Sequence, residues 1–153
     1  MKLRLCAIGR RLPGWLEEGV AEYAKRLPKQ AALDVVALRA SKKPTADEVR
    51  AEEADRLLSK TTSSQLIVAL DERGTQWTTK QLAKRMGDWR DQSLSVAFLI
   101  GGADGLAQEC RDKAGHLWGL SNLTLPHGVA RLLAVEQIYR GWSLLNNHPY
   151  HRE

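Results

Sequence analysis

The sequence is poor in cysteine and has no long apolar run. Its 153 residues include only two cysteines, Cys6 and Cys110, which stand far apart along the chain. This number and spacing exclude a disulfide framework and a Cys-x-x-Cys metal or redox pair, so both thiols are expected to be buried as small apolar residues. No stretch of about 18 apolar residues could span a bilayer, and the first 16 residues show no pattern of a cleavable leader. A cytoplasmic protein that does not enter a membrane is therefore expected.

Several familiar site motifs are also missing. The sequence contains no Gly-x-Gly-x-x-Gly and no Gly-x-x-x-x-Gly-Lys-Ser/Thr, so neither a Rossmann dinucleotide site nor a P-loop is supported. It has no Gly-x-Ser-x-Gly, and neither cysteine stands in a Cys-His context typical of nucleophilic catalysis. His148 and His151 are three residues apart, but Pro149 disfavours the helix that would align them, and no cysteine or carboxylate cluster completes a ligand set. No metal is expected.

Positive charge is present, and it is unevenly distributed. The chain has 23 Lys and Arg against 18 Asp and Glu, a formal charge of +5. Residues 1–43 hold ten basic and four acidic side chains, so the whole excess lies in the first third. Such a face suits a polyanion such as RNA, although chance clustering on a solvated surface would give the same numbers. The length favours one domain covering residues 1–153.

Apolar patterning predicts strands and helices in alternation. The expected strands cover residues 2–8, 33–38, 65–70, 94–100 and, more weakly, 116–120, and the expected helices cover 15–27, 45–60, 78–89, 106–114 and 127–146. Residues 71–74 are expected to form a turn. This order predicts a three-layer α/β domain with a mainly parallel sheet. Ligands of such sheets bind beyond the carboxyl ends of the strands.

Three strand-end loops are therefore the candidate binding segments. They follow Leu70, Ile100 and Leu120. The second begins with the glycine-rich segment 101–105, which follows a strand and precedes a helix. Its backbone N–H groups could approach a ligand, or the segment could be only a tight turn that needs glycine.

The C-terminal helix is apolar on more than one side. One stripe contains Val129, Leu132, Val135, Tyr139 and Trp142, and a second contains Leu133, Ile138, Leu144 and Leu145. This breadth predicts a second partner, most simply another subunit. Glu136 and Arg140 have the i,i+4 spacing of an ion pair.

Four motifs in order resemble one known family. They are Phe-Leu-Ile-Gly-Gly-Ala-Asp-Gly at 98–105, Leu-Thr-Leu-Pro-His at 123–127, Glu-Gln-Ile-Tyr-Arg at 136–140 and His-Pro-Tyr-His-Arg at 148–152. Together, and over the full length of the chain, they resemble the RlmH family. That family methylates N3 of a pseudouridine in 23S ribosomal RNA and belongs to the SPOUT class of methyltransferases.

The resemblance implies a fold and a cofactor. It implies a homodimer whose subunits are threaded into a C-terminal trefoil knot, which sequence physics alone would not suggest because knots are very rare. It implies S-adenosyl-L-methionine as the cofactor, held by the backbone of the knot loops. The residues that match these loops are Leu70, Gly101, Gly102, Ser121, Asn122, Leu123, Thr124, Leu125 and Pro126.

The tail composition and the last of the four motifs suggest the catalytic residues. Tyr150, His151 and Arg152 are expected to bind and orient the nucleotide, because aromatic, imidazole and guanidinium groups stack on bases and bind phosphate. His151 or Glu136 is the expected proton acceptor. A frayed tail, and an ion pair of Glu136 with Arg140 or Arg131, are the structural alternatives. A SPOUT enzyme acting on tRNA and a non-catalytic ribosome-binding or RNA-binding module are the functional alternatives.

Overall fold

The chain alternates strands and helices throughout residues 1–62 and 65–150, which are the residues that the computed structural model describes. The elements are β1 (Lys2–Ile8), α1 (Gly14–Arg26), the 3-10 helix η1 (Lys29–Ala31), β2 (Leu33–Leu38), α2 (Ala46–Leu58), β3 (Leu66–Gln76), α3 (Thr79–Asp91), β4 (Ser95–Ile100), α4 (Gln108–Lys113), β5 (His116–Gly119) and α5 (His127–Leu145). Every predicted strand and helix is present, with ends shifted by a few residues. The Thr45 side chain accepts a hydrogen bond from the Glu48 N–H and caps α2, as its spacing predicts.

The predicted turn at residues 71–74 is wrong, because β3 continues through it to Gln76. Leu70 pairs with Trp118 of β5, and Thr75 then pairs with the same residue, so the register shifts by a bulge between them. A Cβ on Gly74 would stand 2.7 Å from the backbone nitrogen of Gly119. A polar Asp-Glu-Arg-Gly segment therefore forms a β-bulge beside an edge strand rather than a reversal of the chain.

The sheet has five parallel strands in the order β2-β1-β4-β3-β5. The predicted parallel α/β architecture is confirmed. In the two central strands, Leu5 pairs with Phe98, and both side chains are fully buried. Strands buried on both faces carry nearly continuous apolar runs, which is why the sequence of β4 is easily recognised.

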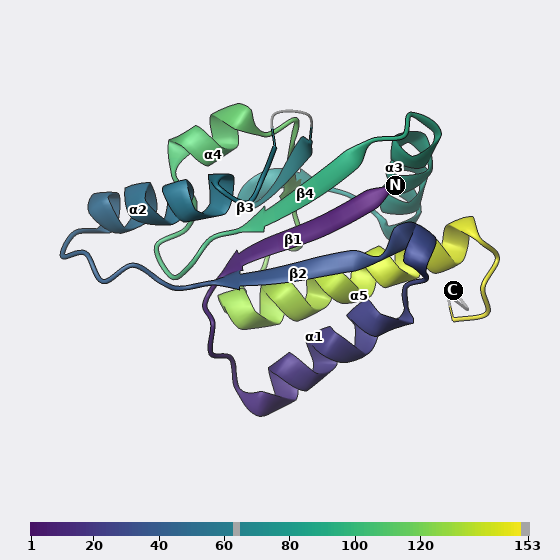
Figure 1. Cartoon of the computed structure of the whole chain (residues 1–153), viewed down its shortest axis with the longest axis horizontal. Helices are drawn as coiled ribbons and strands as arrows, with labels where there is room; N and C mark the ends of the chain where they lie inside the picture. Colours follow the sequence, from purple (N-terminus) through teal and green to yellow (C-terminus); the bar gives the residue numbers. More distant parts are fainter. Residues whose placement is uncertain (63–64, 151–153) are drawn as a thin grey trace.

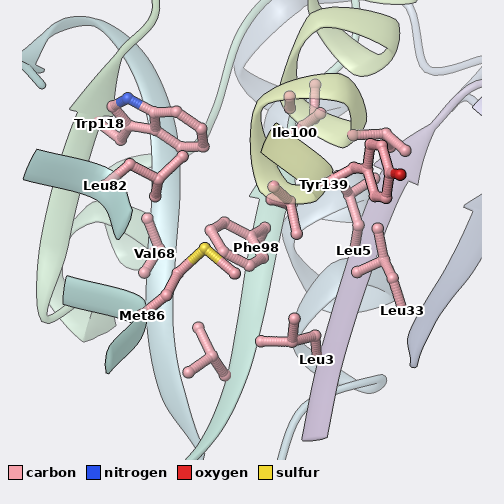
Figure 2. Close-up of a cluster of buried hydrophobic side chains, with 14 of the residues drawn as sticks. Leu3, Leu5, Leu33, Val68, Leu82, Met86, Phe98, Ile100, Trp118 and Tyr139 are labelled. Carbon is pink, nitrogen blue, oxygen red and sulfur yellow. The ribbon is translucent and has the colours of Figure 1, made fainter. Parts of the chain in front are cut away.

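Helices cover both faces of the sheet (Figure 1), with α1 and α5 on one face and α2 and α4 on the other. Figure 2 shows the core on the α5 face, where Phe98 and Val68 lie among Met86, Leu82 and Tyr139. The opposite core includes both cysteines, which are free and buried. Burial raises the pKa of each thiol to about 11, so neither is a reactive nucleophile. None of the described helices combines the length and apolarity needed to cross a bilayer.

Helix α5 lies between α1 and α3, and glycines allow the close approach on both sides. A Cβ on Gly19 of α1 would meet the Leu132 side chain at 2.9 Å, and one on Gly141 of α5 would meet the Met86 sulfur of α3 at 2.8 Å. The breadth of the apolar pattern on α5 is thus explained in part within the chain, and a second subunit stays a prediction. Leu133 is the large apolar residue of α5 that remains exposed, at 39%.

A buried arginine ties α5 to the first strand. The Arg131 side chain is 4% exposed, and its Nη2 donates hydrogen bonds to the carbonyl oxygens of Ile8 at 3.0 Å and Gly9 at 2.8 Å. The start of α5 is thereby fixed at the carboxyl end of β1, which is the edge of the sheet where ligands are expected.

Candidate active site

A cavity of about 420 Å³ lies at the carboxyl edge of the sheet. Its wall is formed by the residues that follow Leu70 in β3, Ile100 in β4 and Trp118 in β5, together with the first turn of α5. These are the three segments that the sequence predicts as binding loops, although the one that follows Leu70 is part of β3 rather than a loop. Of the residues expected to bind the cofactor, the ones that line the cavity are Leu70, Gly101, Gly102, Ser121, Leu123 and Leu125. Asn122, Thr124 and Pro126 belong to the third loop but are not part of the lining.

The glycine-rich segment is a tight turn that also forms part of the cavity wall. A Cβ on Gly101 would stand 2.8 Å from the carbonyl carbon and oxygen of Gly105. The Gly105 N–H donates to the carbonyl oxygen of Gly102 at 3.0 Å, and Gly105 has a φ of +79°. Glycine is needed here for the turn itself. The same turn places backbone without side chains in the cavity wall, and binding of a ligand by its N–H groups stays a prediction.

The third loop is held at both ends. The Ser121 hydroxyl accepts a hydrogen bond from the Leu123 N–H at 2.9 Å, and the Asn122 side-chain oxygen accepts one from the Gln76 amide group of β3. Pro126 is the N-cap residue of α5, and its carbonyl oxygen accepts from the Ala130 N–H at 2.9 Å. Asn122 and Pro126 therefore position a loop whose Leu123 side chain is 74% exposed.

One side of the cavity is charged, and sequence reasoning missed it. The Asp71 carboxylate, which is 4% exposed, forms an ion pair with Arg111 of α4 and accepts a hydrogen bond from the Arg73 N–H at 2.8 Å. Burial alone would raise the pKa of Asp71, but the hydrogen bonds from Arg111 and Arg73 outweigh it and hold the pKa below its usual value. The only signal was the place of Asp71 directly after an apolar strand, since nothing in the sequence links it to Arg111.

The cavity lining also contains apolar side chains. They are Leu70, Ile100, Leu106, Leu120 and Leu125. His127 and the buried Trp118 also reach the cavity, and neither was among the predicted site residues. A pocket lined by both apolar and charged side chains suits a ligand that has both a flat apolar part and charged groups.

The described part of the C-terminal tail folds back on its own chain. The Tyr150 ring lies 4.6 Å from the Tyr139 ring and 6.2 Å from that of Tyr23, and Arg140 lies over it at 5.0 Å. The Tyr150 hydroxyl donates to Oε1 of Glu136 at 3.0 Å. Burial and these hydrogen-bonding neighbours raise the pKa of Tyr150 above its usual value, so the hydroxyl remains a donor. Through Tyr150, the tail is docked rather than frayed.

Glu136 lies in the middle of α5 and is already engaged. It forms the predicted i,i+4 ion pair with Arg140, at 2.7 Å, in addition to accepting the Tyr150 hydrogen bond. His151 and Arg152, the other two tail residues of the predicted site, lie outside the described residues. In the described chain, no group of three His, Cys, Asp and Glu side chains is placed to hold a metal ion.

The cavity and Tyr150 contact different parts of α5. His127 and Ala130 of the first turns line the cavity, whereas Tyr150 packs on Tyr139, about 14 Å further along the helix at 1.5 Å per residue. The structure therefore brings the cofactor-loop residues together, and it places Glu136 and Tyr150 together, but it does not join the two groups within one chain.

Comparison with known proteins identifies the family. Residues 1–151 match the family described as "Predicted SPOUT methyltransferase". The chain belongs to the SPOUT methyltransferase family. It is 46% identical, over 99% of both sequences, to proteins named "Ribosomal RNA large subunit methyltransferase H" from Nitrosococcus oceani and from Burkholderia mallei. The resemblance to the RlmH family carried by the four motifs is confirmed.

Solved structures show the same fold at low sequence identity. One is a probable methylase family protein from Haemophilus influenzae, with a TM-score of 0.58 and 14% identity over 99% of this chain and 70% of that chain. Another is TrmJ from Z. mobilis, with a TM-score of 0.50 and 14% identity over 92% of this chain and 70% of that chain. This SPOUT methyltransferase therefore shares its fold with distant relatives.

Proposed function

We propose that this methyltransferase transfers a methyl group from S-adenosyl-L-methionine to N3 of a pseudouridine in 23S ribosomal RNA, acting on the ribosome in the cytoplasm. The proposed enzyme is a homodimer of single domains, residues 1–153, each with a C-terminal trefoil knot. The observation that carries the proposal is the meeting of the three predicted loops around one cavity, in a chain that is 46% identical to large-subunit rRNA methyltransferases.

The cavity fits the proposed cofactor. Its volume of about 420 Å³ is within the range of pockets for small cofactors. Leu70 of β3 and the leucines that follow β5 offer an apolar surface for an adenine ring, and the backbone of Gly101 and Gly102 offers hydrogen-bonding groups without side chains in the way. The Asp71–Arg111 pair and Arg73 offer charged partners for the amino-acid part. Leu70, Gly101, Gly102 and the residues from Ser121 to Pro126 would hold the cofactor.

The reaction needs positioning and the removal of one proton. The cofactor supplies a methyl group on a positively charged sulfur: the new N3–CH₃ bond forms as the S–CH₃ bond breaks, and its electron pair stays on sulfur. N3 lies between two carbonyl groups and must lose its proton to become nucleophilic. Tyr150, His151 and Arg152 are proposed to bind and orient the nucleotide. Glu136 already accepts hydrogen bonds from Arg140 and Tyr150, so His151 is the preferred proton acceptor and Glu136 the alternative.

The place of Tyr150 supports a second copy of the chain in the proposed enzyme. Tyr150 packs on Tyr139 and donates to Glu136, and neither of these two residues of α5 lines the cavity of the same chain. In a dimer with twofold symmetry, any contact that the tail of one subunit makes with the cavity of the other is repeated in reverse. The tail of each subunit can therefore serve the cavity of its partner. This arrangement supports the proposed homodimer independently of the apolar pattern of α5.

The test is methyl transfer to ribosomal particles that lack the modification. With labelled cofactor, we expect one methyl group per particle on a pseudouridine of 23S RNA, located by mass spectrometry of nuclease fragments. Gly101→Val, which places a branched side chain against the Gly105 carbonyl, should abolish transfer, whereas Gly14→Ala, where a Cβ meets nothing within 4 Å, should not. If tRNA is methylated instead, the proposed rRNA substrate is wrong and the enzyme acts on tRNA. If the protein does not bind the cofactor, a non-catalytic RNA-binding module is favoured.

A further inference from the structure

One acidic side chain of α2 is buried and forms no ion pair with the described residues. Glu53 is 3% exposed, whereas most acidic residues of this helix face the solvent. Its Oε2 accepts a hydrogen bond from the Ser41 N–H at 3.0 Å, but its Oε1 is buried with no hydrogen-bond partner among the described residues. Burying a carboxylate in this way is costly, and an apolar residue would pack beside Leu57 more favourably. A role in stability alone therefore does not account for Glu53.

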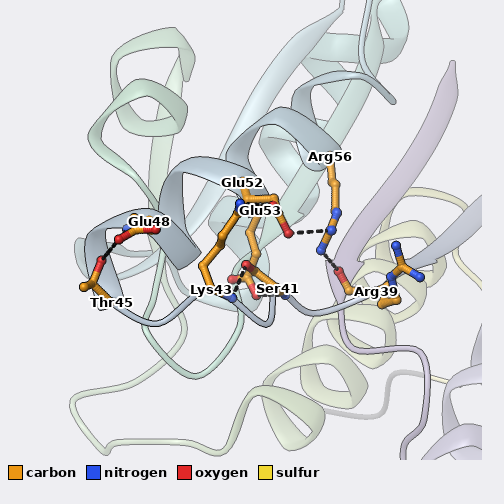
Figure 3. Close-up of polar contacts among 8 residues, drawn as sticks. All are labelled: Arg39, Ser41, Lys43, Thr45, Glu48, Glu52, Glu53 and Arg56. Carbon is orange, nitrogen blue, oxygen red and sulfur yellow. Dashed lines mark hydrogen bonds and ion pairs between the residues drawn. The ribbon is translucent and has the colours of Figure 1, made fainter.

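Two neighbouring cations pair with Glu52 rather than with Glu53 (Figure 3). Arg56 binds Oε1 of Glu52 at 2.6 Å and the Arg39 carbonyl oxygen at 2.8 Å. Lys43 lies 3.8 Å from Glu52. Within residues 1–62 and 65–150, Glu53 forms no ion pair. The chain therefore holds no cation against this buried carboxylate.

The carboxylate of Glu53 lies directly behind the cavity wall. A Cβ on Gly102 would stand 3.1 Å from Oε1 and 3.3 Å from Oε2 of Glu53. Gly102 is itself a lining residue of the cavity, so one glycine separates the charge from the space where the cofactor is proposed to bind. Arg50 of the same helix donates to the Asp104 carbonyl oxygen at 3.2 Å, which fixes the other end of the turn against α2.

We propose that Glu53 is a specificity-determining residue that makes the cavity prefer the positively charged sulfonium cofactor over its neutral thioether product. The inference rests on the proposed function, because it needs the cofactor to bind beside Gly102. A negative charge behind a thin, water-poor wall attracts a sulfonium and has little effect on a thioether of the same shape. At a separation of about 10 Å and an effective dielectric constant between about 20 and 40, the attraction corresponds to about 5- to 20-fold in affinity. The product is thereby released more readily than the donor.

The test is a comparison of two ligands and two neighbouring carboxylates by isothermal titration calorimetry. Glu53→Gln keeps the shape of the side chain and removes its charge. We expect it to weaken binding of S-adenosylmethionine by about 5- to 20-fold and binding of S-adenosylhomocysteine by less than about twofold. The matched control is Glu52→Gln, one residue earlier on α2, where the carboxylate pairs with Arg56. It should change neither affinity by more than about twofold.

The possible outcomes separate the inference from the proposed function. If the unaltered protein binds neither ligand, the proposed cofactor is wrong. If the unaltered protein binds both and Glu53→Gln weakens both equally, Glu53 only shapes the turn and the inference is overturned, as it is if neither affinity changes. Glu53→Asp keeps the charge and should keep the preference for S-adenosylmethionine, so a folded Glu53→Asp protein that has lost the preference also contradicts the inference. Should Glu53→Gln fail to fold, this second variant decides the question.

Discussion

The hydroxyl of Tyr150 donates a hydrogen bond to Oε1 of Glu136 at 3.0 Å, on the half of α5 that points away from the cavity. Arg140 binds the same carboxylate oxygen at 2.7 Å and also lies over the Tyr150 ring at 5.0 Å, so Tyr150 has two contacts with one helix. The tail and the cavity of one chain are thus separate surfaces, and only exchange between two chains brings them together.

Mixed dimers should therefore recover activity from two inactive parents. One parent carries Gly101→Val, which blocks the cavity, and the other carries His151→Ala with Arg152→Ala, which removes the tail groups. After co-expression, half of the dimers are mixed, and each mixed dimer has one intact cavity served by one intact tail, so about a quarter of the normal methyl transfer is expected. Methyl incorporation into ribosomal particles is the measurement.

The matched control for this experiment places both changes on one chain. Co-expression of the doubly altered chain with unaltered chain gives mixed dimers in which the intact cavity faces a defective tail, so only the unaltered homodimers should be active, at about a quarter of the normal methyl transfer. About half of the normal transfer in the control, with none in the first mixture, would mean that each tail serves its own cavity, which contradicts the exchanged arrangement.

Gly101→Ala should weaken cofactor binding by at least about tenfold and lower the Tm. The added Cβ would stand 2.8 Å from the Gly105 backbone, which cannot move as a flexible side chain would. Gly14→Ala is the control, because its Cβ meets nothing within 4 Å at the start of α1. It should leave binding unchanged and raise stability by a few tenths of a kcal/mol or more. Calorimetric titration and thermal unfolding distinguish the two variants.

The Asp71–Arg111 pair should make the free energy of unfolding decrease at acid pH. The pKa of Asp71 is held below its usual value of 3.8, so its contribution to folding is present above that pH and is lost as the pH falls through the lowered pKa. Asp71→Asn should reduce the free energy of unfolding at pH 7 by about 1 to 3 kcal/mol, and the difference from the unaltered protein should shrink below about pH 3. Urea unfolding at both pH values is the measurement.

An exposed pair serves as the comparison for Asp71. Asp88 pairs with Lys84 on the outer face of α3, where the Lys84 side chain is 78% exposed. Asp88→Asn should change the free energy of unfolding by less than about 1 kcal/mol. Equal effects of Asp71→Asn and Asp88→Asn at pH 7 would show that burial beside the cavity gives the Asp71 pair no special strength.

Ribosome binding should depend more on Arg10 and Arg11 than on Lys25 and Arg26. The first two are exposed in the loop after β1 and form no ion pair in the described chain, whereas Lys25 and Arg26 both pair with Glu22. Replacing Arg10 and Arg11 with glutamine should flatten the dependence of log K on log salt by about 1.5. The same change at Lys25 and Arg26 should have a smaller effect. An unchanged slope for the first pair would make the positive excess of residues 1–43 mere surface composition.

The fold could be predicted from the sequence to a large extent, for a physical reason. Strands buried on both faces, such as residues 94–100, must be apolar throughout, and helices such as 78–89 begin at capping residues, so both leave local signals. The bulge at 71–74 left the wrong signal, because its polar residues serve a register shift that depends on β5. Part of the apolar pattern on α5 is covered by the flanking helices α1 and α3, which no local pattern could indicate because they are distant in sequence.

The sequence predicted the part of the candidate site that is formed by backbone, but not the contacts between its side chains. Glycines after a strand indicate a turn at the ligand edge, and the structure places Gly101 and Gly102 there. Asp71 with Arg111, and Glu53 behind Gly102, are contacts between side chains from separate elements. No spacing rule connects such residues. Trp118 and His127 reach the cavity for the same reason, through the pairing of β5 with β3 and the start of α5.

The contact of Arg131 with the carbonyl oxygens of Ile8 and Gly9 joins residues separated by 123 and 122 positions. During synthesis, β1 leaves the ribosome well before the arginine that fixes its carboxyl end. The cavity loop that follows β5 also appears long after β1. A nascent chain therefore has no finished cofactor pocket until α5 has emerged, so chains that stop before α5 are expected to be unable to bind the methyl donor and to be recognised as unfolded.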